Sequence, residues 1–225
     1  MKNSFINKRF ANDGVYNVTF YIIAANIIVY LLFVFNVSIK GVPIVNYLVL
    51  RPIDVIQRLY LWQFITYMFV CPYPSVFTFC IVMLVMLSFG YALERQIGSL
   101  EFLTYYLSIG IFSAICSFIT YIIAGHLRTY IASPWSVMLA VEFLFAMCNP
   151  YARVMFFFFI PMRAPIAVLV IFAMELIFGI APIFGGRALN AVWLYAILGA
   201  WIYTSLRMRM RPLNFWKNLF TPPSR

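Results

Sequence analysis

Long apolar stretches separated by short polar segments run through almost the whole chain. The first of them, centred on YIIAANIIVYLLFVF, is long enough to span a bilayer. Stretches of this character lie at 18–37, 76–93, 102–124, 134–148, 164–180 and 189–206. The pattern therefore predicts an all-α, polytopic membrane protein whose six transmembrane helices form one bundle.

Two segments depart from a plain spanning helix. Residues 38–74, which include Trp62 and Gln63, are apolar but broken by several prolines. We expect this first loop to lie in the membrane interface, where aromatic side chains are favoured. The stretch 134–148 is short for a hydrocarbon layer of ~30 Å. We therefore expect it inside the bundle, with its first turn beside a water-filled cavity.

The composition agrees with a membrane protein, because 65% of the residues are hydrophobic, 10% are charged and the mean hydropathy is +0.95. The net charge of +10 would also suit a nucleic-acid-binding protein, but the basic residues lie in loops and tails beside apolar stretches. The positive-inside rule explains this placement. We therefore expect membrane lipids, and no nucleic acid, as partners.

Six spans place both termini on one side of the membrane. That side carries eleven of the 16 Lys and Arg residues, so we expect both termini in the cytoplasm, at the plasma or inner membrane if the source is prokaryotic. The chain then divides into a cytoplasmic segment at 1–17, a transmembrane domain at 18–206 and a basic cytoplasmic tail at 207–225.

Three stretches, taken together, resemble the rhomboid family of intramembrane serine proteases. They are WQFITYMFV at 62–70, FGYALERQIGSLEFLTYYL at 89–107 and NPYARVMFFFFIPMRAPIAVLVIFAMELIFG at 149–179. The resemblance covers nearly the whole chain and marks Trp62, Gln63, Glu94 and Arg95 as structural or functional polar residues. It implies a rhomboid-like bundle with a membrane-dipping first loop. It also implies a catalytic serine at the start of the short fourth helix, a histidine on the sixth, and a histidine and an asparagine on the second that help to hold the oxyanion.

The serine position of this resemblance is degenerate. Counting back from Pro150 without gaps places it at Trp135, and Ser136 stands where the family has a glycine. A shift of two residues would place it at Ser133, with Pro134 in place of the glycine. In either alignment the Gly-x-Ser-Gly signature is absent.

The other polar positions are replaced as well. The stretch AILGAWIYT at 196–204 fits the sixth helix and puts Ile197 at the histidine position. On the second helix, the histidine and asparagine positions fall on Thr78 and Val82. The chain therefore resembles a catalytically inactive member of the family, a pseudoprotease, and we expect no catalytic residues.

An active protease remains an alternative. A serine hydroxyl is a poor nucleophile without a neighbouring base, and every lysine lies outside the predicted spans. His126 precedes the segment IASPWS, so it is the one candidate base for Ser133 or Ser136. A single histidine and four scattered cysteines build no metal cluster, so we expect no cofactor.

Two carboxylates, Glu142 and Glu175, fall inside predicted spans, where an ionisable residue is costly. Glu142 follows Trp135 by seven residues, so the two share a helix face. We interpret Glu142 as a protonated acid that hydrogen-bonds inside the bundle. A small transporter or channel that uses Glu142 is a further alternative. Glu175 matches a glutamate of the family's fifth helix and is interpreted as structural.

The resemblance to inactive family members implies a function in binding. We expect the protein to bind transmembrane segments of client proteins, with the second and fifth helices forming a lateral opening.

Overall fold

The computed structural model describes residues 17–39, 41–71, 75–156, 160–184 and 192–208. Of residues 155, 156, 160, 175 and 178–184 only the backbone conformation is described, so the predicted structural role of Glu175 lies outside the described side chains.

Helices make up most of the described chain, and the longest ones lie at the predicted spans. Their bounds are α2 Val18–Val34, α6 Val76–Val85, α7 Tyr91–Ile97, α8 Ser99–Ile123, α9 Pro134–Cys148, α10 Ala164–Phe184 and α11 Val192–Leu206. The π-helical turn η2 (Met86–Gly90) joins α6 to α7, so the second helix runs four residues beyond its predicted end. The prediction of a mostly helical protein is confirmed.

Two of the described helices are long and apolar enough to cross a membrane. They are the α6–α7 helix of 22 residues and α8 of 25 residues. The remaining apolar helices are shorter over their described parts, and α9 has 15 residues, as short as its sequence indicated. The six-span bundle therefore stays a prediction.

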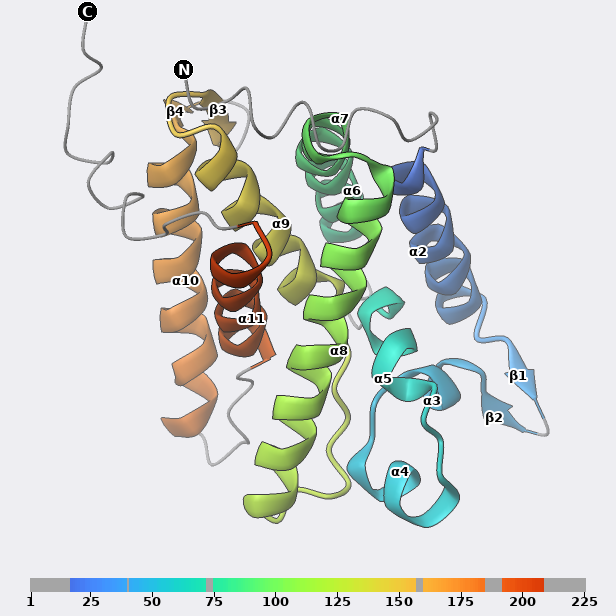
Figure 1. Ribbon diagram of the computed structural model, residues 1–225. Coiled ribbons are helices and arrows are strands. Elements are labelled where there is room, and N and C mark those ends of the chain that lie inside the picture. The colour runs from blue at the N-terminus through green and yellow to red at the C-terminus, as the bar shows by residue number, and fades with distance from the viewer. Residues whose placement is uncertain (1–16, 40, 72–74, 157–159, 185–191, 209–225) are drawn as a thin grey trace, which may run out of the picture.

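The first loop is built from short elements. They are β1 (Ser38–Ile39), β2 (Val42–Pro43), α3 (Val45–Leu48), α4 (Pro52–Arg58), α5 (Gln63–Thr66) and the 3-10 turn η1 (Tyr67–Phe69). Most of them gather at the end of the bundle opposite α7 (Figure 1). Leu50 and Ile131 exchange backbone hydrogen bonds, so this loop is joined to the segment that precedes α9.

A second hairpin, which the hydrophobic pattern did not predict, lies at the other end. β3 (Arg153–Phe156) pairs antiparallel with β4 (Ile160–Arg163) between α9 and α10. It stands at the same end of the bundle as α7 and the start of α2 (Figure 1).

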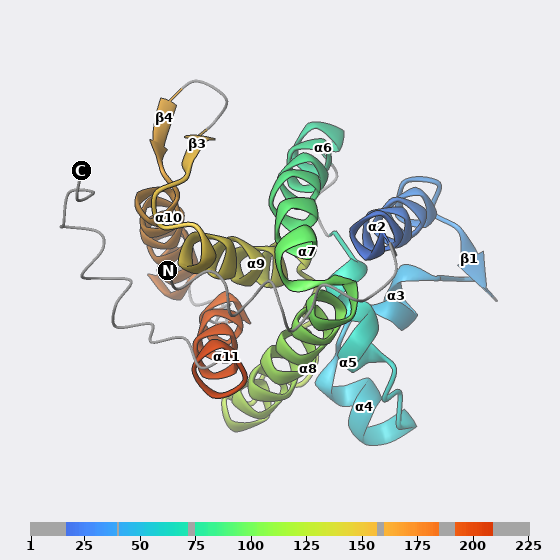
Figure 2. The same ribbon diagram turned by 45° about the horizontal axis from the view of Figure 1, so that its top comes forward.

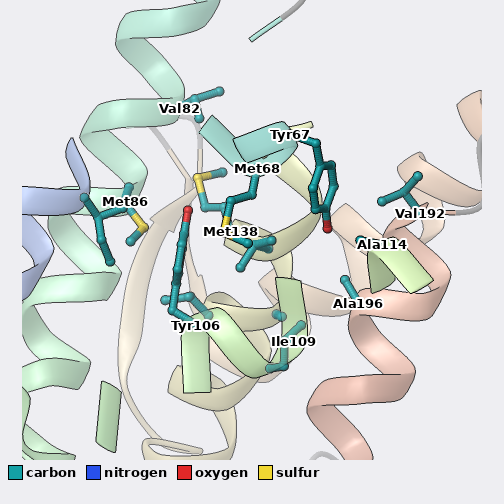
Figure 3. Packing of buried hydrophobic residues seen from close by; sticks show 14 of the residues in the cluster. Tyr67, Met68, Val82, Met86, Tyr106, Ile109, Ala114, Met138, Val192 and Ala196 are labelled. Carbon is teal, nitrogen blue, oxygen red and sulfur yellow. The ribbon is translucent and has the colours of Figure 1, made fainter. Parts of the chain in front are cut away.

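Helix α9 lies in the middle of the bundle, between α10 and α11 on one side and α6, α7 and α8 on the other (Figure 2). Nearly all of its residues from Pro134 to Ala146 are buried. Figure 3 shows how side chains from the first loop, α6, α8, α9 and α11 pack into one core around it. The sequence of α9 is apolar on all sides, which is typical of a helix that is buried all round.

The helix pair α2 and α6–α7 approaches closely at Gly90. A Cβ atom added there would lie 3.1 Å from Thr19 Cγ2, closer than nearly all real Cβ contacts. Gly98, with φ of 90°, then turns the chain from α7 into α8. The glycines of this segment therefore set both the spacing and the direction of three helices.

The Glu94 carboxylate joins these three helices. It accepts hydrogen bonds from the Val18 N–H at 2.8 Å and the Thr19 N–H at 2.9 Å, which are two of the first N–H groups of α2. It also accepts from the Thr19 hydroxyl at 2.6 Å and the Ser99 hydroxyl at 2.6 Å. The first N–H groups of a helix have no partner within it, so a carboxylate at this place stabilises α2 by hydrogen bonds and by charge.

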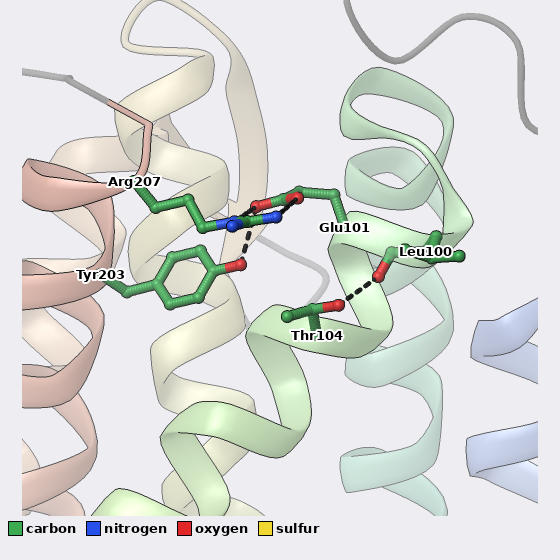
Figure 4. Close-up of polar contacts among 5 residues, drawn as sticks. All are labelled: Leu100, Glu101, Thr104, Tyr203 and Arg207. Carbon is green, nitrogen blue, oxygen red and sulfur yellow. Dashed lines mark hydrogen bonds and ion pairs between the residues drawn. The ribbon is translucent and has the colours of Figure 1, made fainter.

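Two further polar contacts tie the same end of the bundle. Arg207, just beyond α11, donates to both carboxylate oxygens of Glu101 on α8, and the Tyr203 hydroxyl donates to the same group at 2.7 Å (Figure 4). Gln96 and Asn149 exchange two amide hydrogen bonds between α7 and the end of α9. These contacts link elements far apart in the sequence.

We predict that Glu94→Gln lowers the stability of the folded protein by about 2–3 kcal/mol, because an amide offers one acceptor oxygen and no charge to four donors. The thermal unfolding midpoint in detergent should fall clearly. Asp54→Asn, a change of a carboxylate on α4 for which no hydrogen bond is described, is the matched control. An equal midpoint for both variants would show that the Glu94 contacts are dispensable.

Candidate functional site

The segment IASPWS forms the N-terminal cap of α9. Ser133 is the N-cap residue, and its Oγ accepts a hydrogen bond from the Ser136 N–H at 3.2 Å. The Ser136 hydroxyl donates to the Ser133 carbonyl at 3.0 Å. Pro134 occupies the first turn, where its missing N–H costs nothing. Both candidate nucleophiles are therefore engaged in starting the helix.

Tyr67, from η1 of the first loop, lies next to this cap. Its side chain is fully buried, and its hydroxyl donates to the Gly110 carbonyl at 2.8 Å and shares a hydrogen bond with the Ser113 hydroxyl at 2.7 Å. The Ser133 N–H donates to the Tyr67 carbonyl at 3.3 Å. The first loop is thus inserted between α8 and the start of α9, and Figure 3 shows the Tyr67 ring directed toward α8 beside Ala114.

The electrostatics of this phenol favour its neutral form. Burial raises the pKa of Tyr67, and the neighbouring Ser113 and Ser136 hydroxyls oppose the rise only in part. A protonated Tyr67 is a hydrogen-bond donor and cannot remove a proton from a serine. The phenol that the first loop brings to the start of α9 is therefore not a base.

Gly110 allows the loop to dock against α8. A Cβ atom at this position would collide with the terminal methyl group of Met68, which is itself fully buried. A side chain at this position would therefore require the buried Met68 side chain of the first loop to move.

Trp135 packs against the main core with part of its surface exposed. Its indole N–H is buried and has no hydrogen-bond partner among the described residues. The large ring occupies the turn where the resemblance implies a small hydroxymethyl group.

The other degenerate positions lie on the helices that the resemblance implies. Ile197 is half-buried on α11, and Val82 is buried on α6. Thr78 lies in the first turn of α6, where its N–H donates to the Ser75 hydroxyl at 3.3 Å. On α11 the small residues Ala196, Ala200 and Thr204 recur every four positions and are all buried, so this face packs closely against its neighbours.

His126 is exposed in the loop after α8. Its ring packs edge-on against Tyr121, with 6.5 Å between ring centroids. Among the described residues its imidazole makes no hydrogen bond with Ser133 or Ser136. The structure thus does not join His126 to Ser133 or Ser136 by a hydrogen bond.

The remaining predicted residues hold the scaffold. Gln63 is fully buried, and its amide oxygen accepts from the Arg51 N–H at 3.1 Å. The Trp62 indole donates to the Tyr47 carbonyl at 3.0 Å, and the Arg95 guanidinium lies 5.5 Å from the centre of the Tyr91 ring. Glu142 is 2% exposed on α9, in the interior of the bundle.

Sequence reasoning missed Tyr67, Gly110 and Ser113. Tyr67 lies within the quoted motif WQFITYMFV, yet nothing in the motif indicates that its hydroxyl reaches α8. A tyrosine within the predicted first loop was the only signal for this contact in the sequence. Its partner Gly110 is 43 residues away, so the sequence could not identify it.

The family comparison agrees with the helical, apolar architecture. The chain matches the family model described as eukaryotic integral membrane protein (DUF1751) over residues 21–208. The chain belongs to this family. The prediction of an integral membrane protein in a lipid environment is thereby confirmed. No curated protein matches the chain.

We predict that Ser133→Ala destabilises the protein by about 1 kcal/mol through loss of the α9 cap. Ser88→Ala, which removes a hydroxyl bonded within its own helix, should have a much smaller effect. Thermal unfolding in detergent compares the two. If Ser133→Ala melts with the wild type, the hydroxyl is not needed as a cap.

Tyr67→Phe should cost about 1–2 kcal/mol, because the buried Ser113 hydroxyl loses its partner on the first loop. Tyr21→Phe, which changes an exposed tyrosine on α2, is the control and should leave the melting midpoint unchanged. Equal midpoints for the two variants would contradict the docking role of the Tyr67 hydroxyl.

Proposed function

We propose that the protein is a catalytically inactive, rhomboid-like membrane protein that binds transmembrane segments of client proteins. The rhomboid-like part rests on the order of the three motifs and on helices that lie in the positions the resemblance implies. Helices lie at the six predicted stretches, and the basic residues favour one side, which supports six spans with both termini in the cytoplasm.

The inactive state is supported above all by the start of α9. The Ser133 hydroxyl caps the helix, the Ser136 hydroxyl bonds back to Ser133, and Trp135 fills the turn between them. Peptide-bond cleavage by serine needs a base within hydrogen-bond reach of the nucleophile. Tyr67, which lies beside the start of α9, is neutral and supplies no such base.

Client binding is supported by the surroundings of α9. Helices α6 and α10 flank it (Figure 2), and a separate cluster of Phe145, Ala146, Ala164 and Val168 joins α9 to α10. Part of the surface of Phe143 and Met147 on α9 stays exposed beside this cluster. An incoming transmembrane segment that replaces lipid there would pack against aromatic and methionine side chains, which adapt to different partners.

The catalytic question is tested by two measurements on the folded, purified protein. We expect no labelling by a fluorophosphonate probe and no cleavage of a model transmembrane substrate, with an active rhomboid protease as the positive control. Labelling that Ser133→Ala or Ser136→Ala abolishes, together with cleavage, would establish the protease alternative.

The binding question is tested by photo-crosslinking from single positions in native membranes. Leu84 on α6 and Ile177 on α10 are 44% and 66% exposed, and Ile119 on the far part of α8 is 49% exposed. We expect a crosslinker at Leu84 or Ile177 to capture discrete membrane proteins that one at Ile119 does not. The same background at all three positions would remove the client-binding proposal.

A further inference from the structure

The hairpin of β3 and β4 places two arginines directly opposite each other. Arg153 pairs with Arg163 in the antiparallel register, at the end of the hairpin that joins α9 and α10. Residues that face each other across antiparallel strands have Cβ atoms about 4.5–5.5 Å apart and project on the same side. Like charges in this arrangement repel and destabilise the pair.

The two side chains project away from the bundle. Val154, the neighbour of Arg153, packs against the cluster of Phe145, Ala146, Ala164 and Val168. Successive side chains of a strand point to opposite faces, so the arginine face lies on the outside. Arg153 is exposed and Arg163 half-buried, in agreement with this placement.

Neither arginine is neutralised by a described residue. Among the described side chains, the acidic groups nearest this end of the bundle are already engaged, Glu94 by four donors and Glu101 by Arg207 and Tyr203. No ion pair or side-chain hydrogen bond with a described residue is found for Arg153 or Arg163. Helix α10 begins immediately after Arg163 and has no acidic residue in its first turn, so its positive end adds to the same field.

We propose that Arg153 and Arg163 together bind the phosphomonoester headgroup of an anionic membrane lipid. A phosphomonoester carries a charge of about −1.5 to −2, which matches two guanidinium groups, and its oxygens accept their paired N–H groups in a bidentate manner. A lipid is favoured over free phosphate as the ligand because the chain is an integral membrane protein. The hairpin that carries the pair also stands at one end of the helical bundle, beside α7 (Figure 1). This proposal does not depend on client binding.

The test uses the full-length protein in neutral phosphatidylcholine nanodiscs and three probes. They are short-chain phosphatidylinositol 4-phosphate, short-chain phosphatidylserine and inorganic phosphate. We expect the phosphomonoester lipid to bind more tightly than the other two. Arg153→Gln and Arg163→Gln should each weaken its binding about tenfold, and Arg163→Lys, which keeps the charge but loses the forked donor, should weaken it less.

Two control variants separate this site from the general positive charge of the protein. Arg95→Gln removes a charge at the same end of the bundle, and Arg128→Gln removes one from the loop after α8. Both should bind the phosphomonoester lipid as the wild type does.

In this test the loss of lipid binding is not accompanied by a loss of stability. Without ligand, Arg163→Gln should melt at the same temperature as the wild type or higher, because it removes the repulsion. Three results would overturn the proposal: unchanged lipid affinity in both Gln variants, equal binding of phosphatidylserine, or binding of inorganic phosphate as tight as that of the lipid, which would assign the site to free phosphate.

Discussion

Polar groups inside a membrane protein have to find their partners within the protein, since lipid offers none. The Glu94 carboxylate is where this requirement shapes the whole bundle. Its four hydrogen bonds satisfy the start of α2 and the turn into α8, and Glu94 itself is carried by α7. With the close approach at Gly90, this single side chain sets the relative position of three helices.

The same requirement explains the chemistry at the start of α9. The hydroxyls of Ser133 and Ser136 satisfy backbone groups of the first turn, and the Tyr67 hydroxyl satisfies the Gly110 carbonyl and the Ser113 hydroxyl. A catalytic serine would instead have to keep its hydroxyl available to a base. In this protein the described polar atoms at the start of α9 join the first loop, α8 and α9.

The two ends of the bundle are stabilised differently. At the end that contains α7, charged and amide pairs such as Glu101 with Arg207 and Gln96 with Asn149 join distant helices. At the other end, the first loop is joined to the bundle by backbone bonds and by the buried Tyr67. The pair Arg153 and Arg163, for which no described acidic partner is found, gives the hairpin a reason to bind an anion.

The long apolar stretches were enough to locate the principal helices of the bundle. In an apolar solvent the backbone N–H and C=O groups must bond within the chain, and a helix satisfies them within a single segment. The apolar pattern also indicated that α9 is short. It left 149–163 as a connection between two helices but did not predict the β3–β4 hairpin there, because strands of four residues are too short to show a clear alternation. The partners of Glu94 on α2, and those of Tyr67 and Arg207 on α8, lie 43 to 106 residues away in the chain. The residues next to each side chain in the sequence do not indicate such distant partners. The motif alignment predicted which catalytic residues are replaced. Only the packing of the first loop against α8 and α9 showed what surrounds Ser133 and Ser136, since a buried hydroxyl bonds to whichever group the folded chain brings within reach.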